Sequence, residues 1–234
     1  MIRHRCNFGP YELTLYQWEA GNVENPPPLT VGHYLEDPDS LWQQLSKDDQ
    51  HPCHLATITG VSESEFLPYP CPKLGERFSS AQGPEYYHKL TTILIPTLKA
   101  LLSAPVAPAS IIAGYSLAGL FALWAAAQAD SPFERVISCS GSLWYPGVLE
   151  AIALPPERAL RSVYLSVGAK EKNSGPKMFR EVERCTREAY ERYLDCTKTL
   201  VINPGGHFHQ VTERFHQGIA WTLQEWYRTQ ESSS

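Results

Sequence analysis

The sequence predicts an α/β fold: a mostly parallel, doubly wound sheet with an antiparallel edge at its N-terminal end. From residue 53 onwards, short apolar runs alternate with segments of helical periodicity. Right-handed crossovers turn such alternation into a parallel sheet with helices on both faces. Before residue 53, two β-rich segments are joined by a loop without a helix, which indicates antiparallel pairing.

Length and composition indicate one globular domain. The 234 residues are enough for a single core over residues 1–228, and the polar residues 229–234 are expected to form a disordered tail. The hydrophobic content of 43% and the charged content of 19% are ordinary for a soluble protein. A net charge of −5 without a Lys/Arg cluster disfavours nucleic acid as a partner. The oligomeric state is left open.

Targeting and metal signals are missing from the sequence. The basic N-terminus is not followed by an apolar secretory segment, and no stretch has the length of a membrane span. The six cysteines show no C-x-x-C spacing, so neither a metal site nor a cofactor is indicated. Reduced thiols favour a cytoplasmic location.

The first half of the chain contains three predicted strands and one long loop. Segments rich in β-formers predict strands over 11–18, 29–35 and 53–59, with a short amphipathic segment over 40–46. Residues 61–84 have little periodicity and many prolines, and loops of this length in a compact domain are usually functional. A helix is predicted from Pro84 to about residue 102, kinked at Pro96.

In the second half of the chain, predicted strands alternate with predicted helices. Apolar runs predict strands that end near Gly114, Ser140, Gly168 and residue 202, and residues 147–153 suggest a short helix. Long amphipathic helices are predicted over 176–193 and 211–227. Since ligands of open α/β sheets bind at the carboxyl ends of the strands, residues that follow these strands are the candidates for function.

The stretch Gly114-Tyr115-Ser116-Leu117-Ala118 contains the strongest chemical signal. It joins the apolar run 111–113 to an Ala- and Leu-rich helix, which is the strand–turn–helix context of a nucleophile elbow and predicts an α/β-hydrolase fold. A serine is a weak nucleophile unless it is exposed beside a base. Ser116 is therefore the predicted nucleophile, although Ala118 replaces the glycine of the strict G-x-S-x-G pattern.

A base and an acid should follow Ser116 in the order serine, acid, histidine. His207, directly after the last predicted strand and Gly205-Gly206, is favoured over His209, and His216 lies within the last helix. Glu171 is the only carboxylate in the loop after the penultimate strand. Asp195 is the fallback, although it precedes the last strand, and a Ser–His dyad without a close acid is also considered.

The remaining site residues are assigned to oxyanion binding and to the substrate pocket. The backbone N–H of Leu117 is one expected oxyanion donor. The second is expected from Gly60 and Val61, after the strand over 53–59. Aromatic side chains in the long loop and after the strand that ends at Ser140 are expected to surround the substrate. The predicted substrate-binding residues are Phe66, Tyr115, Trp144 and Tyr145.

Four motifs resemble the family called "Putative esterase" (esterase D-like) of the α/β-hydrolases, and most closely its siderophore-esterase branch, which opens enterobactin-type trilactones. The segment GYSLAGLFAL, 114–123, is similar to the elbow GHSLGGLFAL of that branch, and SGSLWY, 140–145, is similar to its SPSLWW segment. Phe66-Leu67-Pro68 resembles the turn after its oxyanion strand. The segment 206–221, with Gly206-His207-Phe208 and Glu213-Arg214, resembles its histidine loop and last helix.

The resemblance runs from about residue 54 to residue 226 and implies a serine esterase. Carried over, it makes Ser116 the nucleophile and His207 the base, with Glu171 at the acid position. The departures are Ala118 for Gly, Tyr115 for His and Gly141 for Pro, and none of them removes a catalytic group.

Two classes of function remain to be separated. The first is a serine hydrolase that cleaves small-molecule carboxylic esters through an acyl-enzyme, with a trilactone siderophore as one candidate substrate; an acyltransferase or a peptidase would share its machinery. The second is a non-catalytic protein of the same fold that binds a ligand or a partner, because fold alone does not guarantee chemistry.

Overall fold

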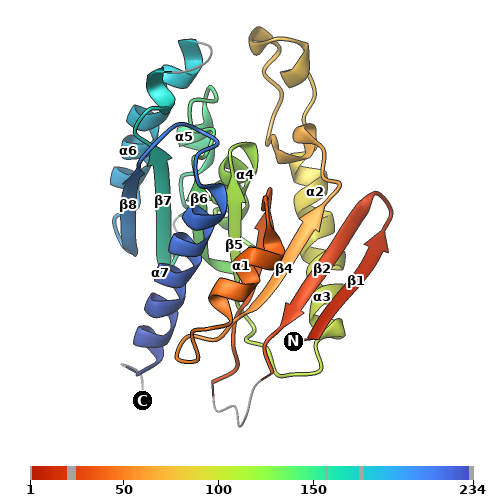
Figure 1. The fold of residues 1–234 in the computed structure, drawn as a ribbon. Helices are drawn as coiled ribbons and strands as arrows, with labels where there is room; N and C mark the ends of the chain where they lie inside the picture. Colours follow the sequence, from red (N-terminus) through yellow and green to blue (C-terminus); the bar gives the residue numbers. More distant parts are fainter. Residues whose placement is uncertain (1, 20–24, 156–157, 174–176, 232–234) are drawn as a thin grey trace.

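The computed structural model describes residues 2–19, 25–155, 158–173 and 177–231. These residues form one eight-stranded sheet in the order β1-β2-β4-β3-β5-β6-β7-β8 (Figure 1). The strands are β1 (Ile2–Phe8), β2 (Tyr11–Gln17), β3 (Leu29–His33), β4 (His54–Thr59), β5 (Ser110–Tyr115), β6 (Phe133–Cys139), β7 (Ser162–Gly168) and β8 (Thr197–Asn203).

Strand pairing confirms a mostly parallel sheet with an antiparallel N-terminal edge. Strand β2 runs antiparallel to both β1 and β4, and every other pairing is parallel. The strands that form this antiparallel edge differ from the predicted ones. The strand that begins at Leu29 is not an edge strand, because β3 lies between β4 and β5 and pairs parallel with both.

The true edge strand, β1, was not predicted. Its sequence, IRHRCNF, alternates half-buried with exposed positions and places Arg3 and Arg5 among the exposed ones. A strand with only one face packed on the core, and that face only partly buried, needs no continuous apolar run. The basic residues Arg3 and Arg5 of the N-terminal segment therefore lie on the outward-facing side of an edge strand.

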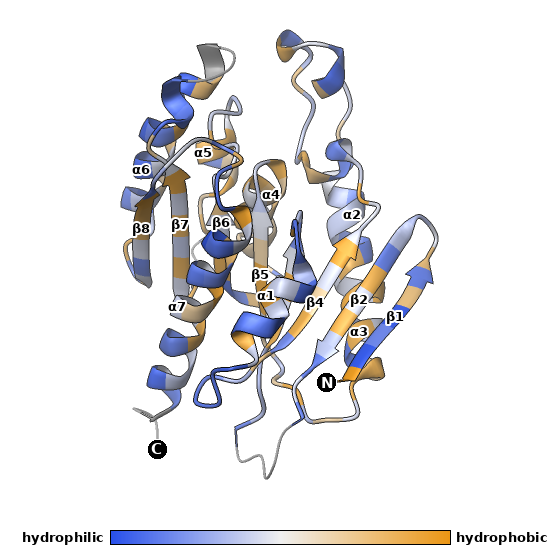
Figure 2. Ribbon diagram, in the orientation of Figure 1, coloured by the Kyte–Doolittle hydropathy of each residue, from blue (hydrophilic) through white to orange (hydrophobic). Residues whose placement is uncertain are grey.

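The helices cover both faces of the sheet (Figure 1). Strands β5 and β6 pack against α4 (Leu117–Ala126), whereas α7 (Val211–Glu231) packs on the opposite face together with α1 (Pro38–Leu45). Two apolar cores result, one on each face, and the central strands β5 to β7 contribute to both. Figure 2 shows the matching pattern, with apolar residues along the inner strands and hydrophilic residues on the outer side of α7.

The predicted helix from Pro84 is divided into three parts: α2 (Gly83–Lys89), a π-helical turn (Leu90–Leu94) and α3 (Ile95–Leu101). Proline has no N–H to donate to the preceding turn. The π-helical turn lies directly before Ile95-Pro96, so the expected irregularity is present and is a widened turn.

The remaining helical segments are short or begin later than predicted. The loop over 61–84 contains three 3₁₀ turns, Glu63–Phe66, Pro72–Leu74 and Glu76–Phe78. Helix α5 spans Val148–Ala151, and α6 spans Val182–Arg192 after 3₁₀ turns at Glu171–Asn173 and Lys177–Glu181. The predicted start of α6 at Pro176 lies outside the described residues.

Helix α7 closes the fold. Its buried residues Phe215, Ile219, Leu223 and Trp226 form the predicted apolar face. The helix continues to Glu231 and so includes the first three residues of the stretch expected to be a disordered tail, while residues 232–234 lie outside the description. Within the described residues, no helix combines the length and the apolar character needed to cross a bilayer.

His33, at the end of β3, should make stability depend on pH. The side chain is fully buried beside Phe66 and Phe121, with Nε2 2.8 Å from the Tyr86 hydroxyl. Burial lowers the pKa of His33 from 6.5 to about 4. Between these values the unfolded chain binds a proton that the folded chain does not, so stability falls as the pH falls. We expect His33 to remove about 3 kcal/mol of unfolding free energy between pH 7 and pH 4.

Urea unfolding of the wild type and of His33→Asn at several pH values tests this expectation. The variant should be less stable at pH 7, because a packed ring is lost, but its stability should fall less steeply on acidification. Parallel pH dependences in the two proteins would show that His33 titrates normally in the folded state.

Candidate active site

Ser116 lies on a sharp turn between β5, which ends at Tyr115, and α4, which begins at Leu117. Its backbone angles, φ 57° and ψ −121°, are unusual for a residue with a side chain. A Cβ atom at Gly114 would overlap the carbonyl group of Ala118, so this position requires glycine. Ala118 itself is fully buried in the turn, and its extra methyl group is accommodated there.

The predicted serine, histidine and acid lie together. Ser116 Oγ is 3.1 Å from His207 Nε2, and His207 Nδ1 is 2.8 Å from Glu171 Oε2. His207 is in the loop between β8 and α7, and Glu171 follows β7, so all three residues come after the carboxyl ends of parallel strands. With a proton on Nδ1 donated to Glu171, Nε2 is free to accept the proton of Ser116.

Glu171 is buried, with 3% of its surface exposed. Its second oxygen, Oε1, accepts hydrogen bonds from Ser140 Oγ and from the Gly168 amide, both at 2.6 Å, and from Arg214 Nη1 at 3.1 Å. Burial opposes ionisation, but the hydrogen bonds from His207, Ser140 and Gly168 outweigh it and lower the pKa of Glu171 below 4.5. The carboxylate is thus held ionised and oriented toward His207.

The alternative bases and acid lie elsewhere. His209 is exposed and packs against Gly205. His216 is within α7, where burial lowers its pKa. Asp195 lies just before β8, at the opposite end of the sheet from the serine.

Unusual backbone conformations are concentrated around this site. Among the described residues other than glycine, four have positive φ: Tyr34 at 61°, Ser116 at 57°, Ser140 at 47° and Gln210 at 54°. Tyr34, Ser116 and Ser140 directly follow the parallel strands β3, β5 and β6, and Gln210 ends the loop that carries His207. Such conformations persist where the surrounding structure enforces them, which is typical of active sites.

The loop expected to supply the second oxyanion donor follows β4, and β4 is not a direct neighbour of the strand that leads to Ser116. The strand that ends at Thr59 is the fourth along the chain, because β1 precedes the first predicted strand, and the third along the chain is β3. Gly60 and Val61 follow β4, which is separated from β5 by β3 and lies roughly 10 Å away. His33 pairs with Gly114, so the next residues, Tyr34 and Leu35, are the ones beside the nucleophile turn.

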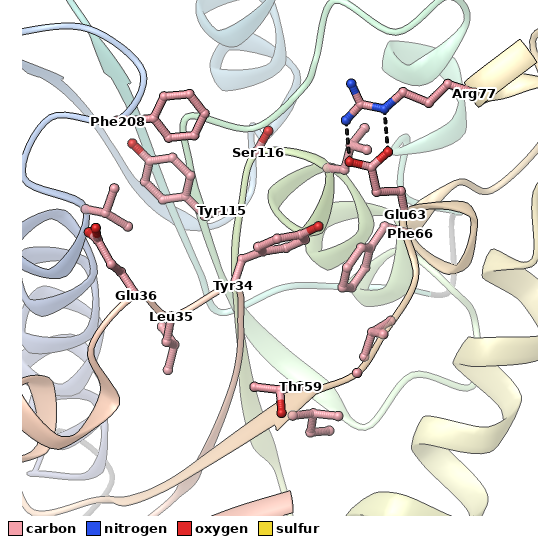
Figure 3. Close-up of a pocket in the computed structure, with 15 residues that line it drawn as sticks. Tyr34, Leu35, Glu36, Thr59, Glu63, Phe66, Arg77, Tyr115, Ser116 and Phe208 are labelled. Carbon is pink, nitrogen blue, oxygen red and sulfur yellow. Dashed lines mark hydrogen bonds and ion pairs between the residues drawn. The ribbon is translucent and has the colours of Figure 1, made fainter. Parts of the chain in front are cut away.

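A cavity of about 580 Å³ opens beside Ser116 (Figure 3). Figure 3 shows Tyr34 reaching into its middle and Phe208 at the side of the histidine loop. Phe208 is 84% exposed and its ring is 4.8 Å from that of His207. The predicted residues Gly60, Val61, Phe66, Tyr115 and Leu117 also line the cavity.

Arg77 and Glu63 form an ion pair on the wall of the cavity, with two hydrogen bonds between the guanidinium and the carboxylate (Figure 3). Both belong to the loop over 61–84. Glu36 is the other charged residue of the lining. The first part of this loop and Arg77 thus line the cavity.

Two of the four predicted substrate residues do not line this cavity. Tyr145 is buried, and its hydroxyl donates to the backbone oxygen of Tyr69 at 2.8 Å. Trp144 packs against Phe78 and Phe179. They join the long loop to its neighbours, and their aromatic character reflects this packing.

Tyr115 lines the cavity, but its hydroxyl has another use. It donates a hydrogen bond to the backbone oxygen of His207 and accepts one from Arg214 Nη1 at 2.9 Å. Arg214 was quoted in the resemblance without a role. Nothing in the sequence pattern distinguishes it from a solvent-facing arginine of an amphipathic helix, yet it is 1% exposed.

The sheet order, the turn at Ser116 and the hydrogen-bonded Ser–His–Glu chain define an α/β-hydrolase-type protein. The described residues contain no cluster of His, Cys, Asp or Glu suited to a metal ion.

Comparisons with known proteins agree with this class. The model of the family described as "Putative esterase" matches residues 61–216. This match covers most of the chain, and the protein belongs to this family of hydrolases. The uncharacterized protein YbbA of Bacillus subtilis is 29% identical over 210 residues, which cover 80% of this chain and 83% of YbbA.

Solved structures show the same fold at low identity. The IroE-like serine hydrolase of Shewanella oneidensis superposes with a TM-score of 0.74 at 12% identity, over 95% of this chain and 80% of the other. The enterobactin esterase FES of Shigella flexneri, in the presence of enterobactin, gives a TM-score of 0.68 at 17% identity. That match covers 98% of this chain and 60% of FES.

Proposed function

We propose that this protein is a serine esterase that cleaves small-molecule carboxylic esters through an acyl-enzyme. The observation that carries the proposal is the continuous hydrogen-bonded chain from Ser116 through His207 to Glu171, beside an open cavity. Membership of the esterase family supports the same reaction.

The reaction begins when His207 Nε2 takes the proton of Ser116 and Oγ attacks the ester carbonyl. Glu171 stabilises the imidazolium that forms, and remains ionised itself. His207 then protonates the departing alcohol, leaving an acyl group on Ser116. A water molecule, deprotonated by His207, releases the acid and restores the free enzyme.

The oxyanion would be bound by backbone amides. Leu117 begins α4, and the first amides of a helix have no partner within it. For the second donor we now propose the loop at Tyr34 and Leu35 in place of Gly60 and Val61, because β3 is the neighbour of β5. One such donor typically contributes about 3 kcal/mol of transition-state stabilisation.

Labelling with a fluorophosphonate probe tests the proposal directly. Such probes react with activated serines, and peptide mass spectrometry locates the adduct. We expect one adduct on Ser116. A folded protein that takes up no probe would favour the alternative of a non-catalytic binding protein.

Acyltransfer and peptide cleavage would use the same residues. Assays with different acceptors and substrates would separate these reactions from ester hydrolysis.

A trilactone siderophore of the enterobactin type is one candidate substrate. The resemblance of the sequence motifs and the fold shared with FES support it. If purified protein cleaves simple esters but leaves such lactones intact, this candidate is excluded while the esterase proposal stands.

The charges of the cavity lead to a prediction about substrate charge. Glu63 neutralises Arg77, and Glu36 adds a further negative charge to the lining. We therefore expect neutral esters to be preferred over anionic ones by about tenfold in kcat/KM. A suitable pair is the 4-nitrophenyl ester of 4-oxopentanoic acid and the 4-nitrophenyl monoester of succinic acid, which are similar in size. Metal-free enterobactin should likewise be cleaved faster than its anionic iron complex.

Glu63→Gln provides the control. The substitution leaves Arg77 without its counter-ion and should raise kcat/KM for the succinate monoester while changing the neutral ester little. Wild-type preference for the anionic ester would contradict the prediction and would identify Arg77 as a binding residue for anions.

A cytoplasmic location is also part of the proposal. All six cysteines are free, as expected where thiols stay reduced. Localisation of a tagged protein in cell fractions would test it.

A further inference from the structure

Arg214 is one of the largest fully buried side chains in the described structure, on the first turn of α7. Taking a guanidinium out of water is costly unless it is paired and hydrogen-bonded, and a buried ion pair is weak evidence for stability by itself. The cost of burying the Arg214 guanidinium suggests that this residue has a role other than stability.

The contacts of Arg214 join two parts of the proposed active site. Nη1 donates to Glu171 Oε1 at 3.1 Å and to Ser140 Oγ at 2.7 Å. Nη2 donates to the backbone oxygens of Gly206 at 2.9 Å and Pro204 at 3.2 Å. One planar group thus holds both the acid and the loop that carries the base.

A third contact extends this arrangement through Tyr115. Arg214 Nη1 donates to the Tyr115 hydroxyl at 2.9 Å, and that hydroxyl donates to the backbone oxygen of His207. His207 is consequently fixed at its side chain by Glu171, at its own carbonyl by Tyr115 and at the preceding carbonyl by Arg214. This accounts for the tyrosine at position 115, where the resembling family has histidine.

We propose that Arg214 is a positioning residue of the esterase, which fixes Glu171 and the His207 loop relative to each other without touching the substrate. This inference rests on the proposed function. It attributes the precise placement of His207 Nε2 beside Ser116 to a cation on α7, and displacements of about 1 Å at such a position can cost about 100-fold in rate.

Arg214→Gln and Arg214→Lys test the proposal against an ordinary structural role. In Arg214→Gln we expect kcat for a 4-nitrophenyl ester to fall about 100-fold with KM changed little, because substrate contacts remain. Lysine keeps the charge but not the planar fork, so Arg214→Lys should recover part of the loss. A large rise in KM with unchanged kcat would overturn the proposal.

Arg135 is the matched control, since it is also buried, at 2% exposed, but lies near the other end of the sheet on β6. Arg135→Gln should lower the melting temperature and leave kcat unchanged. If both glutamine variants lose activity in proportion to their stability, Arg214 is merely structural. Should Arg214→Gln fail to fold, Tyr115→Phe removes the hydroxyl that links Arg214 to the His207 carbonyl. It should lower kcat several-fold; unchanged kcat there would count against the proposal.

Proton NMR gives a readout that does not depend on turnover. The proton between His207 Nδ1 and Glu171 should produce a strongly downfield resonance in the wild type and in Arg135→Gln, and should shift or broaden in Arg214→Gln. A resonance unchanged in folded Arg214→Gln contradicts positioning by Arg214. A wild type that shows the resonance but cleaves no ester and takes up no fluorophosphonate would instead contradict the proposed function.

Discussion

Replacing Ser116 by alanine is expected to abolish ester hydrolysis, with a loss of about 10⁵ to 10⁶ in kcat. Oγ of Ser116 is the atom that would carry the acyl group. The hydroxyl of Ser142, 3.4 Å from Ser116 Oγ, belongs to another loop. Fluorophosphonate labelling should be lost together with turnover. Binding of substrate should persist, because the cavity walls are unchanged.

The measurement requires a control for folding and for contaminating hydrolases. Ser46→Ala changes a serine at the end of α1 that does not line the cavity, and should keep wild-type activity after the same purification. Residual activity of Ser116→Ala within tenfold of the wild type would mean that another nucleophile, or no covalent intermediate, operates.

The second large effect is expected from Glu171→Gln. The glutamine amide can no longer stabilise a positively charged imidazole, and it can hold the wrong tautomer of His207. In serine proteases the comparable change costs about 10⁴ in kcat. We expect a loss of about 10³ to 10⁴ here, measured as kcat for a 4-nitrophenyl ester at pH 7.5.

Asp195→Asn is the matched control, because Asp195 is the fallback acid named from the sequence. It should leave kcat unchanged, since Asp195 precedes β8 at the far end of the sheet. Equal activity of Glu171→Gln and the wild type would indicate a Ser–His dyad.

Glu171 should also contribute to stability in a pH-dependent manner. Its pKa is lowered in the folded state, so its stabilising contribution is present above the unfolded value and is lost as the pH falls through the folded value. The difference in unfolding free energy between wild type and Glu171→Gln should therefore be largest near neutral pH and shrink below about pH 4.5.

Much of the site could be predicted because its parts are local in sequence. Ser116, Glu171 and His207 each come after a segment whose composition predicts a strand, and parallel strands bring their carboxyl ends to one edge. Motif and order along the chain were then sufficient to assign the three roles as hypotheses.

The parts that the sequence did not reveal depend on contacts between distant segments. β1 lacks an apolar run, so the sequence pattern does not indicate it. The pattern also does not reveal that β3, and not β4, is the neighbour of β5. Arg214 has the sequence setting of an exposed arginine, and only the packing of α7 against the strand ends makes it buried. The packing of Trp144 and Tyr145 could not be predicted either, because an aromatic residue gives the same sequence signal whether it contacts a ligand or a neighbouring loop.

The positive φ angles around the site have a consequence for any attempt to improve this protein. Residues with side chains held in that region cost of order 1 to 3 kcal/mol each, and Tyr34, Ser116 and Ser140 are among them. Glycine at position 116 would relieve the strain and remove the nucleophile in a single step. A screen for thermal stability alone would therefore reward the loss of catalysis, so variants of this chain must be selected for turnover and stability together.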